Sequence, residues 1–398
     1  MMKLTKDSRY NQDLVNEIME YTCNRGIFID IEEAEKVYKK LIDEINSHEE
    51  LAREELCEDF RNMNLNSPAQ VATVFVNQFQ LEKYAKKTKK GNYSFGKEVL
   101  DKIIEKEDNK FAYHLKNYRS LTSLTKKLKE IVDCLDEDCR VHPQFKHCDT
   151  NRIHFNTPGL SNLNERIRPI IGVPEGRKLI KADYKSQEFY IAVNMLGIDK
   201  LKPIFEEGKD PYKEMVQILT GHEMKPEQRE TMKTLWISGT YGSQFGGMNL
   251  DKDEKEFSEL VLKEIENIPE MVEFKKYIDD EIIPYNKPIE SYFGTIREFP
   301  TYERNKNRLK RIVFNNIMQI TGADILFFAM ESCNNKFKEL GYTRDDILIY
   351  LSIHDELIFD VKEEIVTEEL LENIRQAMTL DIEGWSKIKV NIEVTDNY

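Results

Sequence analysis

Carboxylate side chains stand at the ends of two predicted strands. Asp183 ends the β-like run 177–184, and Asp355 with Glu356 follows the apolar run 347–353. Carboxylates at neighbouring strand ends repel each other unless cations lie between them, so such a set binds divalent metal ions readily. Two Mg²⁺ ions held there activate an attacking hydroxyl and stabilise the leaving oxygen in a phosphoryl transfer. Each acidic motif alone is also consistent with a structural role.

A second chemical signal lies between the two acidic motifs. Arg229, Lys233, Ile237 and Tyr241 are four residues apart, so on one helix they share a stripe. Two cations and an aromatic ring on one stripe suit a helix that binds a triphosphate at one end and stacks a base at the other. The alternative is a surface stripe with a buried tyrosine.

The sequence pattern predicts a small sheet that carries these acidic residues, with helical lobes before and between its strands. Apolar residues at three- and four-residue spacing predict the helices, and alternation predicts the strands. Asn66-Ser67-Pro68 is a helix-start signal. The helical ranges are 10–60, 98–132, 187–196 and 210–290, the last interrupted at 241–247. The strand ranges are 140–146, 177–184, 347–353 and 357–361.

Composition indicates a soluble globular chain of 398 residues, 40% hydrophobic and 33% charged. No apolar run approaches the roughly 18 to 20 residues of a spanning helix, and the N-terminus lacks a signal peptide core. We therefore expect a cytoplasmic protein with no membrane partner. Six cysteines are too few for a disulfide framework. One cluster of possible metal ligands contains Cys134, Cys139, His142, His147 and Cys148. Its spacing matches a zinc site poorly, so we expect the cysteines to be reduced thiols.

The net charge of −14 hides a segregation of charge along the chain. Basic residues concentrate in 83–90, 116–129 and 291–320, and acidic residues in 251–281 and 363–383. This distribution predicts either a positive groove for phosphates on a negative body or ordinary solvated helix faces. Charge alone does not decide between the two.

Together these motifs resemble the polymerase domain of family A DNA polymerases, the class of bacterial DNA polymerase I and the mitochondrial replicative enzyme. The metal-binding motif is Asp183-Tyr-Lys-Ser-Gln-Glu-Phe-Tyr190, which resembles the mitochondrial form more closely, and the palm hairpin is His354-Asp355-Glu356. The fingers-helix motif is Arg229-x3-Lys233-x7-Tyr241-Gly242. Three further motifs occur in the same order as in the family, so that the resemblance spans residues 10–398. They are 150–152 with 158–162, 311–319 leading into 321–324, and 26–30 with 65–68.

The resemblance implies a role for each matching residue. It makes Asp183, Asp355 and the Tyr184 carbonyl ligands of two Mg²⁺ ions, with Mn²⁺ as an alternative ion and Glu356 in support. It assigns Arg229 and Lys233 to the incoming triphosphate, Lys233 also as a proton donor to pyrophosphate, and Tyr241 to the templating base. Glu188 matches the steric gate that excludes a ribose 2′-hydroxyl. The residues implied to contact primer and template are Arg152, Arg311, Asn315, Gln319 and His354.

Several positions depart from the family pattern. Ile237 stands where the family usually has Phe or Tyr, beside Trp236, and Tyr212 stands where a phosphate-binding His is frequent. Asn151 and Ser161 replace a usual Gly and Gln. No departure removes a metal ligand, so we expect an active enzyme with altered selectivity.

The resemblance implies an α+β right-hand polymerase fold: a palm with a small antiparallel sheet, and helical fingers and thumb. The expected domains are an N-terminal helical segment at 1–59, thumb at 60–139, palm at 140–204 and 291–398, and fingers at 205–290. No proofreading domain is expected, because the chain begins at the polymerase domain. The sequence identifies no processivity or replisome factor. The resemblance implies a bacterial or phage-infected cell, with an organelle as the alternative.

The predicted function is template-directed addition of dNTPs to a DNA primer. Three alternatives stay open. A single-subunit RNA polymerase shares the palm, although Glu188 argues against it. A two-metal nuclease would not need the stripe of Arg229 and Lys233. A non-catalytic protein that binds primer and template would keep the fold without the activity.

Overall fold

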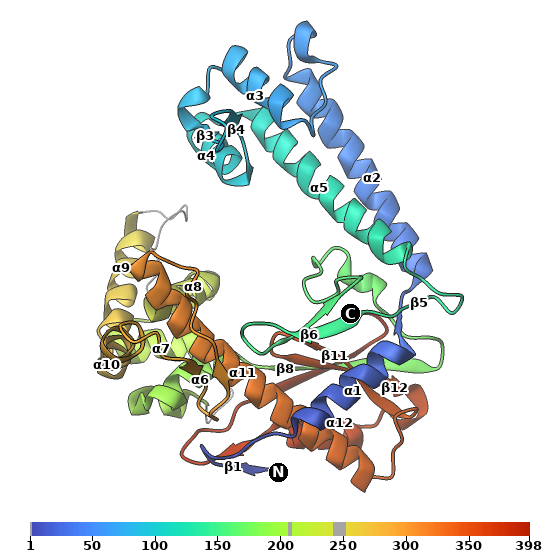
Figure 1. The fold of residues 1–398 in the computed structure, drawn as a ribbon, viewed down its shortest axis with the longest axis vertical. Helices are drawn as coiled ribbons and strands as arrows, with labels where there is room; N and C mark the ends of the chain where they lie inside the picture. The colour runs from blue at the N-terminus through green and yellow to red at the C-terminus, as the bar shows by residue number, and fades with distance from the viewer. Residues whose placement is uncertain (1, 206–208, 242–251) are drawn as a thin grey trace. The chain divides into compact units, whose positions relative to one another are not determined.

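The computed structural model describes residues 2–205, 209–241 and 252–398. These residues form two compact units, shown together in Figure 1. The large unit contains residues 1–26, 143–161 and 173–396, and the small unit contains residues 27–142, 162–172 and 397–398. The chain therefore passes between the units several times, and the assignment of thumb, palm and fingers to segments of them stays a prediction.

A four-stranded antiparallel sheet lies in the large unit, with the strand order β11-β12-β8-β14 (Figure 1). Its strands are β8 (Arg177–Tyr184), β11 (Ile347–Ile353), β12 (Glu356–Lys362) and β14 (Val390–Thr395). The predicted strand at 177–184 and the predicted hairpin are both confirmed. β11 is buried along its whole length, which agrees with its continuous apolar run.

This sheet contacts the helices α1 (Gln12–Arg25), α11 (Lys306–Glu339) and α12 (Glu368–Met378). α11 corrects the expectation that no segment approaches the length of a membrane span. Within the described residues, this one helix is long and apolar enough to cross a membrane. However, 78% of the most apolar 18-residue segment of α11 is buried inside the protein, so this helix belongs to the core.

The segment between β8 and α11 is mainly helical, as predicted. Here α8 contacts both α7 and α9. The helices are α6 (Gln187–Leu196), α7 (Pro211–Thr220), α8 (Arg229–Tyr241), α9 (Lys252–Glu266) and α10 (Pro269–Tyr277). Short strands complete the large unit: β1 (Lys3–Leu4) with β13 (Asp381–Ile382), β6 (Gln144–His147) with β7 (Ile153–Asn156), and β9 (Ile289–Glu290) with β10 (Ile296–Arg297).

The long helices α2 (Ile31–Glu54) and α5 (Lys110–Val132) pack against each other in the small unit (Figure 1). Stacked rings of Phe75 and Phe95, 4.5 Å apart, belong to its core. Ser67 caps α3, which confirms the predicted helix start. The remaining elements are α3 (Pro68–Asn77), α4 (Lys97–Glu107), β2 (Ile27–Phe28) with β5 (Arg140–Val141), and β3 (Lys86–Lys87) with β4 (Tyr93–Ser94).

The predicted strand at 140–146 is divided into β5 and β6. Pro143 lies between them, and proline has no N–H to donate to a ladder. The helical range 98–132 is likewise divided, because Asp108 adopts φ +46° and Asn109 caps α5. None of the six cysteines forms a disulfide. The described residues contain no group of three or more His, Cys, Asp or Glu that could bind a metal.

Some of the basic side chains that are clustered in the sequence are paired with acids in the structure. Lys83 forms an ion pair with Glu107 at 2.7 Å, and Lys116 pairs with Asp101 at 2.5 Å. Arg119 donates to backbone carbonyls, including that of Leu65. The segregation of charge along the sequence is therefore partly cancelled in three dimensions.

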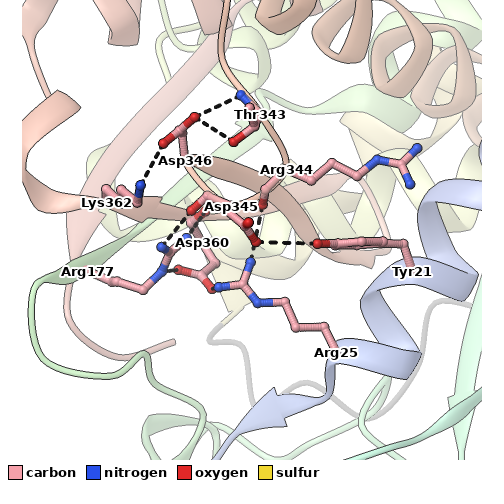
Figure 2. A network of polar contacts seen from close by, with 9 residues as sticks. All are labelled: Tyr21, Arg25, Arg177, Thr343, Arg344, Asp345, Asp346, Asp360 and Lys362. Carbon is pink, nitrogen blue, oxygen red and sulfur yellow. Dashed lines mark hydrogen bonds and ion pairs between the residues drawn. The ribbon is translucent and has the colours of Figure 1, made fainter.

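A buried ion network joins strands β8 and β12 to helix α1 (Figure 2). Asp360 on β12 is fully buried and accepts from Arg177 Nε, while Arg25 Nη2 lies 3.5 Å from its second oxygen. The two guanidinium groups also donate to the carbonyls of Asp345 (2.9 Å) and Arg344 (3.2 Å). The network thus ties the sheet to α1 and to the loop that precedes β11.

Candidate active site

The register of the sheet brings the predicted carboxylates together. Asp183 near the end of β8 lies directly opposite Glu356 at the start of β12. Asp355 lies in the turn between β11 and β12, beside His354, which adopts φ +55°. The backbone N–H of Tyr184 donates to the carbonyl of Asp355 at 3.1 Å, which fixes the turn against the end of β8.

A cavity of about 330 Å³ opens beside these carboxylates. Residues from β8, α6, α7, α8, the β11–β12 turn and β14 line it. Eight of its lining residues are predicted site residues: Asp183, Tyr184, Glu188, Tyr212, Arg229, Lys233, Ile237 and Asp355. The cavity therefore joins the acidic pair to the described part of the helix stripe.

Both carboxylates lie in an environment that disfavours their charge. Burial raises the pKa of Asp183, and burial together with the charges of Asp183 and Glu188 raises the pKa of Asp355. Arg152 opposes this by lowering the pKa of Asp355. In the described part of the chain, neither carboxylate forms an ion pair with a basic side chain. Two neighbouring, partly desolvated carboxylates that form no direct ion pair are a donor set that fits a divalent cation.

The side chain of Tyr184 holds the end of β8 in place. It is almost completely buried, and its hydroxyl donates to the carbonyl of Met378 at 2.8 Å. Burial raises its pKa well above the ordinary value, so this tyrosine stays neutral. Only the backbone of Tyr184 can therefore supply the metal ligand that was predicted at this position.

Helix α8 carries the predicted triphosphate-binding residues. Arg229 donates from Nε to Asp210 at 2.6 Å and from Nη1 to Glu230 at 3.0 Å. Lys233 is exposed at the cavity and forms no ion pair within the described residues. Tyr241 is the last residue of α8, but its side chain, like Gly242, lies outside the described part of the chain.

Trp236 and Gly239 fix the position of α8 against its neighbours. Trp236 is 1% exposed, and its ring centroid lies 4.3 Å from that of Phe189 on α6. Gly239 faces Ile265 on α9, where an added Cβ would lie only 2.6 Å from a side-chain carbon. The indole ring therefore supports the contact between α6 and α8. Both Trp236 and Ile237 line the cavity.

Glu188 and Tyr212 line the same cavity as Asp355. Tyr212 is 4% exposed, its side chain forms a hydrogen bond with Ser186, and burial raises its pKa to about 12. Ser186 adopts φ +55° directly before α6, and Glu188 lies in the first turn of that helix. This arrangement holds a neutral hydroxyl and a carboxylate side by side.

The five residues predicted to contact DNA do not line the cavity. Three of them, Arg311, Asn315 and Gln319, are half-buried and share one stripe of α11. Asn315 Oδ1 and Arg152 Nε are buried without a hydrogen-bond partner. Buried polar atoms are rarely left unpaired, so these two atoms indicate where a ligand could bind.

Two lining or neighbouring residues were not identified from the sequence. Asn391 lies opposite Asp183 across the β8–β14 ladder, and its Nδ2 donates to the carboxylate at 3.4 Å. Asp210 pairs with Arg229 and also caps α7. Asp210-Pro211 is a recognisable helix start, but the contacts of both residues depend on long-range register and packing that no local pattern specifies.

A family model for DNA polymerase family A matches residues 31–398. DNA polymerase I of Pseudomonas aeruginosa is 26% identical over 347 residues, which cover 81% of this chain and 37% of that protein. A thermostable DNA polymerase I of Thermus aquaticus is 26% identical over 341 residues, covering 79% of this chain and 40% of that protein. The chain thus spans about two fifths of the length of these relatives.

A solved structure has a similar fold. It is the POL domain of Pol1 from M. smegmatis in complex with DNA primer-template and dNTP. The TM-score is 0.82 at 23% identity, and the match covers 96% of this chain and 69% of that one. The predicted α+β right-hand polymerase fold, with a small antiparallel sheet and helical surroundings, is confirmed by this match.

Proposed function

Because this chain belongs to DNA polymerase family A, we propose that it extends a DNA primer with dNTPs along a template. The observation that carries the proposal is the cavity shared by Asp183, Asp355, Arg229 and Lys233. It combines a site for divalent cations with basic side chains for a triphosphate, and a nuclease would not need the latter. Primer-template DNA and dNTPs are the proposed partners.

In the proposed reaction, the primer 3′-hydroxyl gives its proton to water and its oxygen forms a bond to the α-phosphorus of the dNTP. The bond from that phosphorus to the bridging oxygen breaks, and pyrophosphate leaves. Asp183, Asp355 and the Tyr184 carbonyl would hold two Mg²⁺ or Mn²⁺ ions, with Glu356 in support. When bound, the ions lower the pKa of the primer hydroxyl and neutralise charge on the phosphates.

The basic side chains act on the triphosphate in this proposal. Arg229 and Lys233 bind its phosphates, and Lys233, which is exposed at the cavity, can give a proton to the leaving pyrophosphate. Tyr241 packs near the templating base. The residues that contact the primer and template are Arg152, Arg311, Asn315, Gln319 and His354. The unpaired buried atoms described above, Arg152 Nε and Asn315 Oδ1, belong to two of them.

Primer extension with Asp183→Asn and Asp355→Asn tests the proposal. Both variants should lose about 10³-fold or more in rate, since a metal site contributes several kcal/mol to the transition state. Their Tm without Mg²⁺ should equal or exceed that of the wild type, because the raised pKa values mean that ionised carboxylates oppose folding. Asp199→Asn, at an exposed carboxylate, is the matched control. Wild-type extension by Asp183→Asn would contradict the proposal.

Sugar selectivity is the second part of the proposal. Glu188 in the cavity wall would exclude a ribose 2′-hydroxyl. The segment 183–190, which contains it, resembles the mitochondrial-type motif. Ile237 has no aromatic ring to pack against the sugar, in contrast to Phe or Tyr. Glu188→Ala should raise the incorporation of rNTPs relative to dNTPs at least tenfold. Equal use of rNTPs by the wild type would instead favour an RNA polymerase.

The same assays test the remaining alternative, a non-catalytic protein that binds primer and template. Tight binding of DNA without incorporation of any nucleotide, under conditions in which the protein is folded, would favour it. The domain boundaries, the cytoplasmic location and the identity of any processivity factor stay predictions.

A further inference from the structure

Asn151 occupies a tight turn between β6 and β7. It is completely buried and adopts φ +63°, a conformation that asparagine tolerates better than most residues. Its N–H donates to the carbonyl of Cys148 at 2.9 Å, and the N–H of Cys148 donates to the carbonyl of Arg152 at 3.0 Å. The turn is therefore closed on both sides, and Asn151 directly precedes the predicted DNA contact Arg152.

The side chain of Asn151 connects this turn to three other segments. Its Nδ2 donates to the hydroxyl of Tyr10 at 2.8 Å and to Asp324 Oδ1 at 3.3 Å. Its Oδ1 accepts from Arg297 Nη2. Both the donor and the acceptor of the amide are thus used, with partners from the N-terminal segment, from α11 and from β10.

These partners are themselves held in place. Asp324 is completely buried and also accepts from Ser291 Oγ at 2.5 Å and Thr295 Oγ1 at 2.9 Å. The ring of Tyr10 packs edge-on against Phe327 and Phe328, with centroids 5.1 and 5.6 Å away. Asn151 is therefore attached to a polar network whose members have further contacts of their own.

Arg152 is the residue that this network can orient toward the reaction. It is half-buried, its Nε is buried without a partner, and its charge lowers the pKa of Asp355. An arginine with an unused buried donor near a proposed metal ligand is placed to contact the end of a primer. A guanidinium group is effective only when its planar fork is held in the correct direction.

We propose that Asn151 is a positioning residue, which uses its amide contacts with Asp324, Tyr10 and Arg297 to fix the turn that aims Arg152 at the primer terminus. The inference rests on the proposed function, in which Arg152 contacts DNA. It assigns Asn151 no contact with substrate. The expected effect is therefore on primer-template binding, transmitted through Arg152.

The test is a double-mutant cycle of Asn151→Gly and Arg152→Ala in primer extension. Glycine adopts φ +63° without strain, so Asn151→Gly removes the side-chain contacts and retains the turn. We expect Asn151→Gly to raise the KM for primer-template about tenfold, with kcat changed less than threefold. The double variant should be no worse than Arg152→Ala alone, because one residue acts through the other.

Two further variants distinguish the loss of positioning from a folding defect. Asn286→Gly replaces an exposed asparagine that also has a positive φ of +47° and should leave the KM unchanged. Tyr10→Phe removes only a hydroxyl from the network. It should raise the KM two- to threefold in the same direction, which keeps the inference testable if Asn151→Gly does not fold.

Distinct outcomes separate this inference from the proposed function. A wild-type KM for Asn151→Gly, or independent multiplying effects of the two substitutions, would show that Asn151 has only a structural role. A wild-type KM for Arg152→Ala would also overturn the inference, while leaving the proposed function intact if Asp183→Asn is inactive. Normal extension by Asp183→Asn would overturn the proposed function itself.

Discussion

Arg229 is paired with Asp210: the Nε of the guanidinium donates to the carboxylate at 2.6 Å. The same carboxylate accepts from the backbone N–H groups of Tyr212 and Lys213 and so caps α7. The guanidinium also lies over the ring of Tyr212, 5.4 Å from its centroid. The first of the two proposed triphosphate-binding cations is thus already bound to an internal anion, with which a nucleotide must compete.

Asp210→Asn should therefore lower the KM for dNTPs. Asparagine is as good a helix cap as aspartate, so α7 is retained while the negative charge beside Arg229 is removed. We expect a decrease of three- to tenfold in single-nucleotide incorporation assays at low ionic strength, and a smaller decrease at high salt. Glu230→Gln removes the other, exposed acid that contacts Arg229 and should change the KM less than twofold. An increased KM in Asp210→Asn would mean that Asp210 orients Arg229 for the substrate.

Asn391 gives a test of the cation site that does not need activity. Asn391→Asp would place a further carboxylate opposite Asp183, across the β8–β14 ladder. We expect a lower Tm in EDTA, because like charges repel, and a larger increase of Tm on addition of Mg²⁺ than in the wild type. Asn286→Asp, in an exposed loop, is the control for the added charge. An unchanged response to Mg²⁺ would argue against a cation beside Asp183.

Local sequence patterns predicted the elements that carry the site. β8 and α6 have the predicted bounds, because strand alternation ends at Tyr184 and helical spacing begins at Gln187. The clustering of Asp183 with Asp355 also followed from the sequence, since both motifs end strands. The resemblance supplied the order of the motifs, which periodicity alone does not specify.

Long-range contacts could not be predicted in this way. The placement of Asn391 opposite Asp183 depends on the register of β14, and the pairing of Arg229 with Asp210 depends on the packing of α8 beside α7. Likewise, the spacing of basic residues gave no sign that Lys116 is paired with Asp101. The local sequence predicts helices, strands and helix caps. It does not predict these contacts, because they join segments that are distant in the sequence.

Asp360→Asn should destabilise the protein strongly. It would leave Arg177 and Arg25 beside a neutral group in a buried setting, and breaking a buried ion pair costs about 3 kcal/mol or more (Figure 2). Urea denaturation should show this loss in the free energy of unfolding. Asp346→Asn breaks the half-buried pair with Lys362 in the same region and should cost much less, because both of these side chains stay accessible to water. Equal losses in the two variants would show that burial of Asp360 contributes nothing.

The buried carboxyl of Asp324 predicts a dependence of stability on pH. Burial raises its pKa to about 6, against the contacts with Ser291, Thr295, Asn151 and Arg297 that lower it. In the unfolded chain this pKa is near 4. Since the folded state binds the proton more tightly, the contribution of Asp324 to stability is fully present below pH about 4. It is lost as the pH rises through about 6.

The measurement is the difference in the free energy of unfolding between the wild type and Asp324→Asn from pH 4 to pH 8. Other titrating groups are common to both proteins and cancel in this difference. Relative to the variant, the wild type should lose stability as the pH rises from about 4 to about 6, and the difference should be constant above about pH 7. A difference that does not change with pH would mean that Asp324 has an ordinary pKa in the folded protein. In that case the contacts with Arg297 and the hydroxyl groups, which stabilise the charged form, outweigh the effect of burial.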